Sequence, residues 1–392
     1  MMKNVPEIRF RGFDGEWEED KIGNLFDIFA GGDISKEHLK DISNDIYRYP
    51  VYANTLVNKG LHGYSDIYKF DGETITVTGR GANTGVANAR YNKYYPIVRL
   101  LVLCPKEKCN IKFFEEVINN SKIFIESTGV PQLTGPQISK VKVKFPLNEE
   151  QERIASFLTK VDKLIEMQDE KVKNYELYKK GMMQKIFSQE IRFRGDRGEE
   201  YPKWEERKLN ELLYENKERN YENKYSKDDV LSVSGEYGIV NQIKFLGRSY
   251  AGESVENYHV VHTGDIVYTK SPLKSNPYGI IKVNKGLEGI VSTLYAVYSC
   301  KEIANGKYLD YYFQLDDNTN KYIRPLVNKG AKNDMKINNE YFLTDKIMVP
   351  SIKEQERIVR FFEAIDRVLD KEKEKLGELR KWKKGLLQGM FV

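Results

Sequence analysis

Residues 146–187 read PLNEEQERIASFLTKVDKLIEMQDEKVKNYELYKKGMMQKIF, and residues 350–391 read PSIKEQERIVRFFEAIDRVLDKEKEKLGELRKWKKGLLQGMF. The second copy begins 204 positions after the first, and no insertion or deletion interrupts the 42 aligned residues. A long segment that recurs in one register predicts two equivalent structural elements. This pair decides the fold of the 392-residue chain.

Both copies have the apolar spacing of a long helix. Alternate steps of four and three residues from Ile154 and from Ile358 reach apolar or aromatic side chains at eight of ten positions in each copy. A coiled coil buries a seam with this period of 3.5 residues. The predicted seam comprises Ile154, Leu158, Val161, Ile165, Val172, Tyr175, Met182 and Ile186, followed by Ile358, Phe362, Ile365, Leu369, Leu376, Leu379, Leu386 and Met390.

The direction of the two helices follows from chain geometry if they pair. The segment between them receives the end of the first helix and starts the second, so the pair must be antiparallel. At 1.5 Å per residue, the helices predict a rod about 60 Å long with a globular body at each end. The alternative is two similar amphipathic helices that pack on separate cores.

The duplication extends beyond the helices. Ile8-Arg9-Phe10-Arg11-Gly12 returns at residues 191–195, and Trp17 returns as Trp204. We therefore predict a mixed α/β (α+β) fold with two globular domains and a pseudo-twofold internal duplication. The predicted boundaries are 1–145 for the first globular domain, 146–187 for the central helix, 188–349 for the second globular domain and 350–392 for the C-terminal helix.

Several segments of the globular domains have local signals. The apolar run 94–104 and the run 289–298 each predict one strand, and residues 113–119 predict a helix. Residues 79–85 form a glycine-rich turn cluster, and residues 128–136 predict an irregular loop.

The sequence offers little support for chemistry in this chain. It contains no phosphate-binding P-loop and no nucleophile elbow. Gly31-Gly32 lacks the second spaced glycine of a methyl-donor motif, and Ser275-Asn276-Pro277-Tyr278 lacks one proline of the adenine-methyltransferase motif. Cys104, Cys109 and Cys300 fit neither a metal site nor a disulfide framework. We expect a cytoplasmic protein without a signal peptide or membrane span.

Basic, polar and aromatic residues gather in the predicted loops, and the net charge of +5 permits a polyanionic partner. Lys and Arg contact phosphates, whereas Arg, Lys, Asn, Gln, Ser and Thr read base edges. Ordinary solvated loop residues are the alternative. The candidate DNA-binding residues are Arg80, Asn83, Thr84, Arg90, Lys93, Gln132, Thr134, Gln137, Lys270, Lys274, Asn276, Lys329, Lys332 and Asn333.

Two divergent domains, each followed by a helix that begins Pro-x-x-x-Glu-Gln-Glu-Arg-Ile, resemble the specificity subunit of type I restriction-modification enzymes. Lys180–Phe187 and its copy Lys384–Phe391 add to the resemblance, as does the Gly31-Gly32 turn. The second domain has Tyr214-Glu215-Asn216 near the place of that turn and departs from the pattern.

The resemblance implies two target-recognition domains, each of which reads one half of a bipartite site in double-stranded DNA. The helices would set the spacing and dock two modification subunits. Those subunits would bind S-adenosylmethionine, and restriction subunits would use ATP and Mg. This chain would carry no cofactor, no metal and no catalytic residue, and would contact no membrane.

Two other functions remain open at this point. One is an enzyme, either a fused or stand-alone DNA methyltransferase or a nuclease. The other is a coiled-coil scaffold without a role on DNA.

Overall fold

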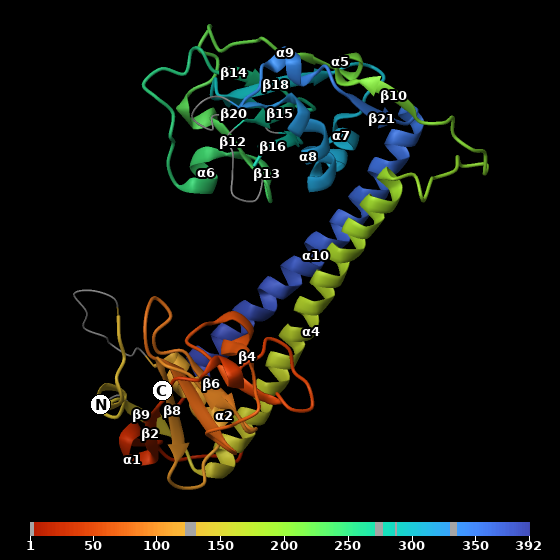
Figure 1. Ribbon diagram of the computed structural model, residues 1–392. Coiled ribbons are helices and arrows are strands. Elements are labelled where there is room, and N and C mark those ends of the chain that lie inside the picture. The colour runs from red at the N-terminus through yellow and green to blue at the C-terminus, as the bar shows by residue number, and fades with distance from the viewer. Residues whose placement is uncertain (1–3, 122–130, 271–276, 287, 330–334) are drawn as a thin grey trace. The chain divides into compact units, whose positions relative to one another are not determined.

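The protein is described by a computed structural model that covers residues 4–121, 131–270, 277–286, 288–329 and 335–392 (Figure 1). Side chains are described for the same residues except 328, 329, 335 and 336. The chain divides into two compact units. Unit 1 comprises residues 1–170 and 374–392, and unit 2 comprises residues 171–373.

Unit 1 is built on a four-stranded antiparallel sheet. The strand order is β2 (Phe26–Ala30), β8 (Leu100–Pro105), β5 (Thr74–Thr78) and β6 (Ala87–Arg90). A second sheet has the order β4 (Leu61–Ser65), β3 (Tyr49–Tyr52) and β7 (Tyr95–Pro96), and β1 (Glu18–Lys21) pairs with β9 (Lys142–Phe145). The helices of the globular part are α1 (Ile22–Leu25), α2 (Ile111–Asn120) and α3 (Gly135–Ile138), and 3-10 turns occur at Lys36–His38 and Val57–Gly60.

The core of unit 1 lies between the four-stranded sheet and α2. All five side chains of β5 are buried, so the strand runs through the interior. Phe113 and Phe114 of α2 are buried in the same cluster, and Asn110 caps the helix by accepting a hydrogen bond from the Phe113 backbone at 3.0 Å. The last residues of α10, including Met390, complete the core (Figure 1).

Unit 2 repeats this plan. Its four-stranded sheet has the order β11 (Leu213–Glu215), β18 (Tyr295–Cys300), β15 (Ile266–Thr269) and β16 (Ile280–Val283). Four strand pairs accompany it: β10 (Glu205–Lys208) with β21 (Lys346–Val349), β12 (Leu231–Ser234) with β13 (Gly238–Asn241), β14 (His259–Val261) with β17 (Gly289–Val291), and β19 (Asn328–Lys329) with β20 (Met335–Lys336). The helices are α5 (Leu209–Leu212), α6 (Gln242–Leu246), α7 (Gly306–Gln314), α8 (Asp316–Ile323) and α9 (Asn339–Phe342), with 3-10 turns at Lys227–Asp229 and Arg324–Leu326.

The two repeated stretches form α4 (Asn148–Phe187) and α10 (Ile352–Met390), which lie side by side (Figure 1). Ion pairs join them within each unit: Asp162–Lys383 at 2.6 Å and Asp169–Arg380 at 2.9 Å in unit 1, then Lys171–Glu372 at 2.7 Å and Lys179–Asp366 at 2.6 Å in unit 2. In each unit the residue number on α4 rises as that on α10 falls. The helices are therefore antiparallel in both units.

Every side chain of the sixteen-residue seam is buried or half-buried. The polar breaks have a structural role as well. Lys179 and Lys383 interrupt the seam at matching positions, and each binds an aspartate on the other helix, Asp366 and Asp162. The internal duplication thus reproduces one interhelical ion pair in both units.

The repeated Glu-Gln of the helix start fastens each long helix to its globular part. Arg9 donates from Nε and Nη2 to Glu150 at 2.8 Å each, and Arg192 binds Glu354 in the same way at 3.2 and 2.7 Å. Glu150 is 2% exposed and Glu354 is fully buried. We call each Arg–Glu pair a latch.

The glutamine that follows each latch glutamate binds the start of a globular helix. Gln151 Oε1 accepts from the backbone of Asn110 at 3.1 Å, and Gln355 Oε1 accepts from that of Asn305 at 2.8 Å. Asn110 and Asn305 are the N-caps of α2 and α7. The backbone entry of each globular part is also repeated, because Ile8 donates to Gly389 O at 2.8 Å and Ile191 to Lys185 O at 3.1 Å.

Three local predictions were wrong. The run 94–104 is two strands, β7 and β8, and the run 289–298 is β17 and β18. In each case the first strand pairs in one sheet and the second in another, so the chain must turn between them. Arg99, with φ of 71°, makes the first of these turns. The loop predicted at 128–136 ends at Thr134, since α3 begins at Gly135; residues 128–130 lie outside the described part.

Candidate nucleic-acid interface

Two predicted loops of unit 1 meet at the end of β5. Arg80 and Gln132 form an isolated β-bridge. Leu133 donates its backbone N–H to Gly79 O at 2.8 Å, and Gly81 donates to Pro131 O at 2.9 Å. The glycine-rich turn and the segment before α3 therefore form one surface, which we call the unit 1 reader surface.

Asn54, in the loop after β3, holds this surface together. Its Oδ1 accepts from the backbone N–H groups of Gly79 at 2.9 Å and Arg80 at 3.1 Å, and its Nδ2 donates to Arg80 O at 2.8 Å. A lone asparagine in a loop has no sequence signal that distinguishes this role from ordinary solvation, so sequence reasoning missed it.

Arg99 also joins the reader surface. Gly79 donates its N–H to Arg99 O at 2.8 Å, and a Cβ on Gly79 would lie 2.8 Å from that oxygen, so glycine permits the approach. Arg80 and Arg99 are both exposed, and within the described residues neither guanidinium has a hydrogen-bond or ion-pair partner. Two free guanidinium groups on adjacent turns suit phosphates or guanine edges.

The other predicted residues of this surface are partly committed to local structure. Asn83 is exposed on the turn. Thr84 Oγ1 donates to Gly81 O at 2.6 Å and so stabilises the turn. Gln137 Oε1 accepts from the N–H and the Oγ1 of Thr134 at 2.8 and 2.9 Å, which fixes the start of α3.

The prediction that Arg90 contacts DNA was wrong. Arg90 is 7% exposed; its Nε donates to Thr76 Oγ1 at 2.9 Å, its Nη2 donates to Lys59 O at 2.5 Å, and its guanidinium lies 3.5 Å from the centre of the Tyr52 ring. Burial lowers the pKa of Arg90. The side chain connects β5, β6 and the loop before β4.

Lys93 lies away from the reader surface. It follows β6, at the opposite end of the β5–β6 hairpin from Arg80. Its Nζ is 4.6 Å from the centre of the Tyr68 ring and 3.5 Å from Asp71, and the contacts with Tyr68 and Asp71 raise the pKa of Lys93. Arg80 and Lys93 belong to one basic run, and the sequence did not reveal that they lie at opposite ends of a β-hairpin.

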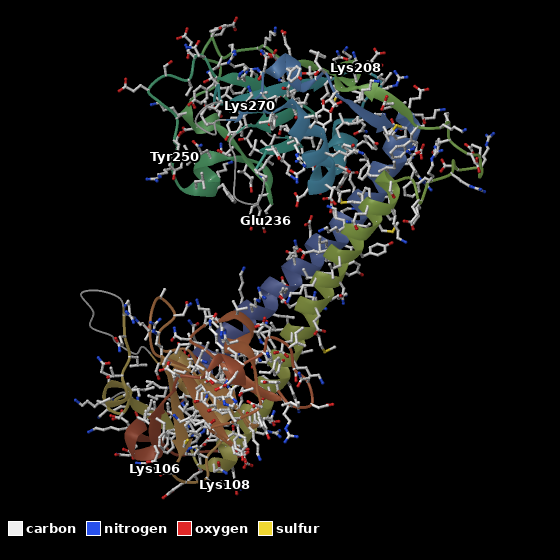
Figure 2. The ribbon with its side chains drawn as sticks, viewed as in Figure 1. Lys106, Lys108, Lys208, Glu236, Tyr250 and Lys270 are labelled. Carbon is white, nitrogen blue, oxygen red and sulfur yellow. The ribbon has the colours of Figure 1, made fainter. Side chains whose placement is uncertain are left out.

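In unit 2, Lys270, which is labelled in Figure 2, directly follows β15. Gly79 follows β5 of unit 1 in the same way. Lys270 Nζ donates to Asn339 Oδ1, and Asn339 Nδ2 donates to Glu215 Oε1 at 2.6 Å. Burial lowers the pKa of Lys270. Lys329 lies on β19, although its side chain is outside the described part, and Lys274, Asn276, Lys332 and Asn333 lie outside it entirely.

A second surface occurs once in each unit. In unit 1, the Phe157 ring packs on Phe10 at 5.6 Å and on Trp382 at 6.3 Å. In unit 2, Phe361 packs on Phe193 at 5.3 Å, and Tyr178 occupies the repeat position of Trp382. Trp382 and Tyr178 are both exposed.

Each of these exposed aromatic residues is followed one helical turn later by a glycine. Gly385 and Gly181 have no neighbour within 4 Å of the position a Cβ would take. Glycine in a helix interior costs roughly 1 kcal/mol relative to alanine, so a bare glycine at both repeat positions suits close approach by another chain. We call each exposed aromatic residue with its glycine a helix patch.

Two kinds of reactive group, metal clusters and activated thiols, can be judged for the described residues. No group of three or more His, Cys, Asp or Glu side chains among them could hold a metal ion. Burial raises the pKa of Cys109 and of Cys300 to about 11, which disfavours a nucleophilic thiolate. Within the same residues, no helix has the length and apolar character to cross a membrane.

Residues 14–175 and 201–381 match the family model of the type I restriction modification DNA specificity domain. The chain belongs to this family of specificity domains. The two matched segments cover both units, so the duplication in the sequence is a duplication of the specificity domain.

Relatives of this specificity protein include a putative type I specificity subunit of Mycoplasma pneumoniae, which is 30% identical over 145 residues, covering 36% of this chain and 39% of that one. The chain spans about two fifths to one half of the Mycoplasma relatives it matches. The putative MjaX specificity subunit of Methanocaldococcus jannaschii is 23% identical and matches 97% of this chain and 90% of its own length.

The fold is also found in a solved structure. The S subunit of a type I restriction-modification system from M. genitalium has a TM-score of 0.60 and covers 99% of both chains at 14% identity. The architecture of two mixed domains with two long helices is therefore the fold of specificity subunits.

Proposed function

We propose that this specificity protein is the DNA-binding subunit of a type I restriction-modification complex, and that each unit reads one half of a bipartite site. The main support is the unit 1 reader surface, where hydrogen bonds join four segments and leave Arg80 and Arg99 exposed without partners among the described residues. Family membership gives this surface its expected ligand, double-stranded DNA.

The two units would read different half-sites. The frames are repeated, from the latches to the strand order, but the residues after the central strand differ: Gly79-Arg80 follows β5 and Lys270 follows β15. A shared scaffold with unlike readers favours an asymmetric target. The paired helices would set the distance between the halves, because each is continuous along its length.

The helix patches would dock the modification subunits. A patch of one exposed aromatic residue and one bare glycine occurs at equivalent positions in each unit, which favours two copies of one partner. Exposed aromatic residues commonly anchor protein interfaces, and a bare glycine lets a partner helix come close. Restriction subunits would then join the complex through these partners.

Catalysis would belong to the partner subunits. They would bind S-adenosylmethionine, ATP and Mg, and this chain would carry no cofactor and no metal. The absence of glycine-rich cofactor motifs in the sequence and the raised pKa values of the buried thiols support this division of labour.

The proposal is tested by mapping methylated adenines in cells that carry the partner subunits, with and without this chain. We expect one bipartite motif to depend on the chain. Replacing residues 1–145 with another recognition domain should change one half of that motif only. A change in both halves, or a motif that persists without the chain, would contradict modular reading. Methyl transfer by the isolated chain would instead favour a fused enzyme.

A further inference from the structure

The loop between β3 and β4 carries two exposed aliphatic side chains beside the unit 1 reader surface. Leu56 is 46% exposed and Val57 is 69% exposed. They follow Asn54, whose side chain clamps the backbone of Gly79 and Arg80. The aliphatic pair is therefore tied directly to the loop that presents Arg80.

This loop is held at its other end as well. Ala53 donates its backbone N–H to Gly60 O at 2.8 Å, which closes the loop, and Arg90 donates to Lys59 O at 2.5 Å. The buried Arg90 guanidinium is itself fixed on the Tyr52 ring. The sequence predicted that Arg90 contacts DNA. In the structure, its side chain instead holds the loop that carries Leu56 and Val57.

The backbone between the anchors adopts an uncommon conformation. Asn58 and Lys59 have φ values of 47° and 53°, in the left-handed region that non-glycine residues rarely enter. Such strain persists only where the surroundings over-determine it, and it is concentrated at functional sites. The pair is consequently presented by a preorganised loop and has little freedom to fold back onto the protein.

The charges around the pair favour nucleic acid as the partner. Arg80 and Arg99 lie on the same reader surface with no partner among the described residues. Lys59, in the loop itself, is instead paired with Glu166 at 3.1 Å. Two exposed guanidinium groups without carboxylate partners among the described residues suit an anionic partner. DNA provides phosphates for them and stacked bases for the aliphatic groups.

We propose that Leu56 and Val57 form an apolar wedge that enters a base step next to the half-site read by unit 1. Proteins that insert aliphatic side chains between base pairs unstack and kink the duplex there. The wedge would make recognition sensitive to how easily that step deforms, independently of hydrogen bonds to base edges. The proposal rests on the proposed DNA-binding function.

The test compares the full chain with its Leu56→Ser/Val57→Ser variant, each assembled with the modification subunits. The probe is a duplex that carries the site found by methylation mapping, alongside a duplex without it. Removing the exposed parts of two aliphatic groups from the interface should weaken binding by about 30-fold. The salt dependence of binding should not change, because no phosphate contact is lost.

Unwinding gives the second measurement. A relaxed plasmid with copies of the site is bound, treated with topoisomerase and deproteinised, and the change in linking number per complex is counted. The wild type should unwind the site more than the variant. Any unwinding by the modification subunits is common to both proteins, so the difference belongs to the wedge.

Two variants serve as controls. Ile42→Ser/Ile46→Ser removes two exposed aliphatic groups elsewhere on unit 1 and should bind and unwind as the wild type does. Leu56→Met/Val57→Ile keeps the wedge apolar and should retain both properties.

Four outcomes are informative. Weaker binding and less unwinding in the serine variant alone would support the wedge. Unchanged binding and unwinding would overturn it while leaving the proposed function intact. Loss of modification subunits without loss of DNA would also overturn it, since the pair would then dock protein. Failure of the wild type to bind any duplex would overturn the proposed function and the wedge together.

Discussion

The latch of unit 1 can be broken without removing much volume, by the substitution Arg9→Met. Methionine retains most of the aliphatic stem, but both bonds to Glu150, at 2.8 Å each, are lost. The bonds to the backbone oxygens of Asp14 and Gly15 are lost too. Glu150 is 2% exposed and would be left without its partner. Leaving one member of such a pair buried costs about 3–5 kcal/mol.

The expected value lies near the lower end of that range. The Arg9 side chain is 14% exposed, so some water can reach the carboxylate after the substitution. We expect unit 1 to lose about 3 kcal/mol of its free energy of unfolding, because partial hydration offsets part of the penalty. Replacing both partners, as in Arg9→Met/Glu150→Leu, should recover most of this loss, since no buried charge remains.

Urea denaturation followed by circular dichroism measures these effects, and the transition of unit 1 is assigned by fluorescence in a Trp204→Phe background, where Trp17 and Trp382 remain. Lys142→Met is the matched control, because it removes an ion pair from the solvent-exposed surface that is shorter than the latch, to Glu19 at 2.6 Å. We expect no measurable change for the control. If Arg9→Met were no more destabilised than the control, or the double variant were as damaged as the single one, the latch argument would fail.

Three further predictions concern the DNA, the pH response and the partners. Arg99→Ala should weaken duplex binding by about 1–3 kcal/mol and relax only the unit 1 half-site; Lys108→Ala, an exposed control, should have little effect in the same fluorescence-anisotropy titration. Burial lowers the pKa of His259 from 6.5 to about 4 in the folded protein, so the unfolded chain binds a proton more readily. The contribution of neutral His259 to the free energy of unfolding is therefore complete above pH 6.5 and is lost as the pH falls toward 4. Between pH 7 and pH 5 the wild type should lose about 2 kcal/mol more than His259→Phe, and equal losses in urea melts would rule this out. Gly385→Leu should impair assembly with the modification subunits, measured by analytical ultracentrifugation, whereas Gly377→Leu, at an open helix glycine without a repeat counterpart, should not; equal assembly of both would remove the helix patch from the interface.

The long helices could be predicted because their signal is periodic and occurs twice. Each seam position constrains the next through the 3.5-residue period, and the matching breaks at Lys179 and Lys383 mark ion pairs that the sequence alone had shown only as interruptions. The apolar pattern of residues 113–119 and the glycine-rich cluster at 79–85 similarly located α2 and the turn after β5.

The reader surface could be predicted only as a set of loops. Which residues point outward depends on pairing between segments that are distant in sequence, as Asn54 with Arg80 and Arg99 with Gly79 show. Arg90 is buried for the same reason, because strand pairing brings it against Thr76 and the Tyr52 ring. The strand breaks near residues 97–99 and 292–294 were hidden for a related reason, since a continuous apolar run does not reveal that its halves enter different sheets.

The repeated backbone bonds at the entries, Ile8 to Gly389 and Ile191 to Lys185, have a topological consequence. One bond closes a few residues of continuous chain, and the other joins segments from opposite ends of the polypeptide, yet both occupy the same place in the fold. Each unit is thus joined at the same point to a long helix, whether or not the peptide chain is continuous there. A circular permutant that begins near Ser188 and joins residue 392 to residue 1 through a short linker should fold into both units. In its sequence, unit 2 would precede unit 1.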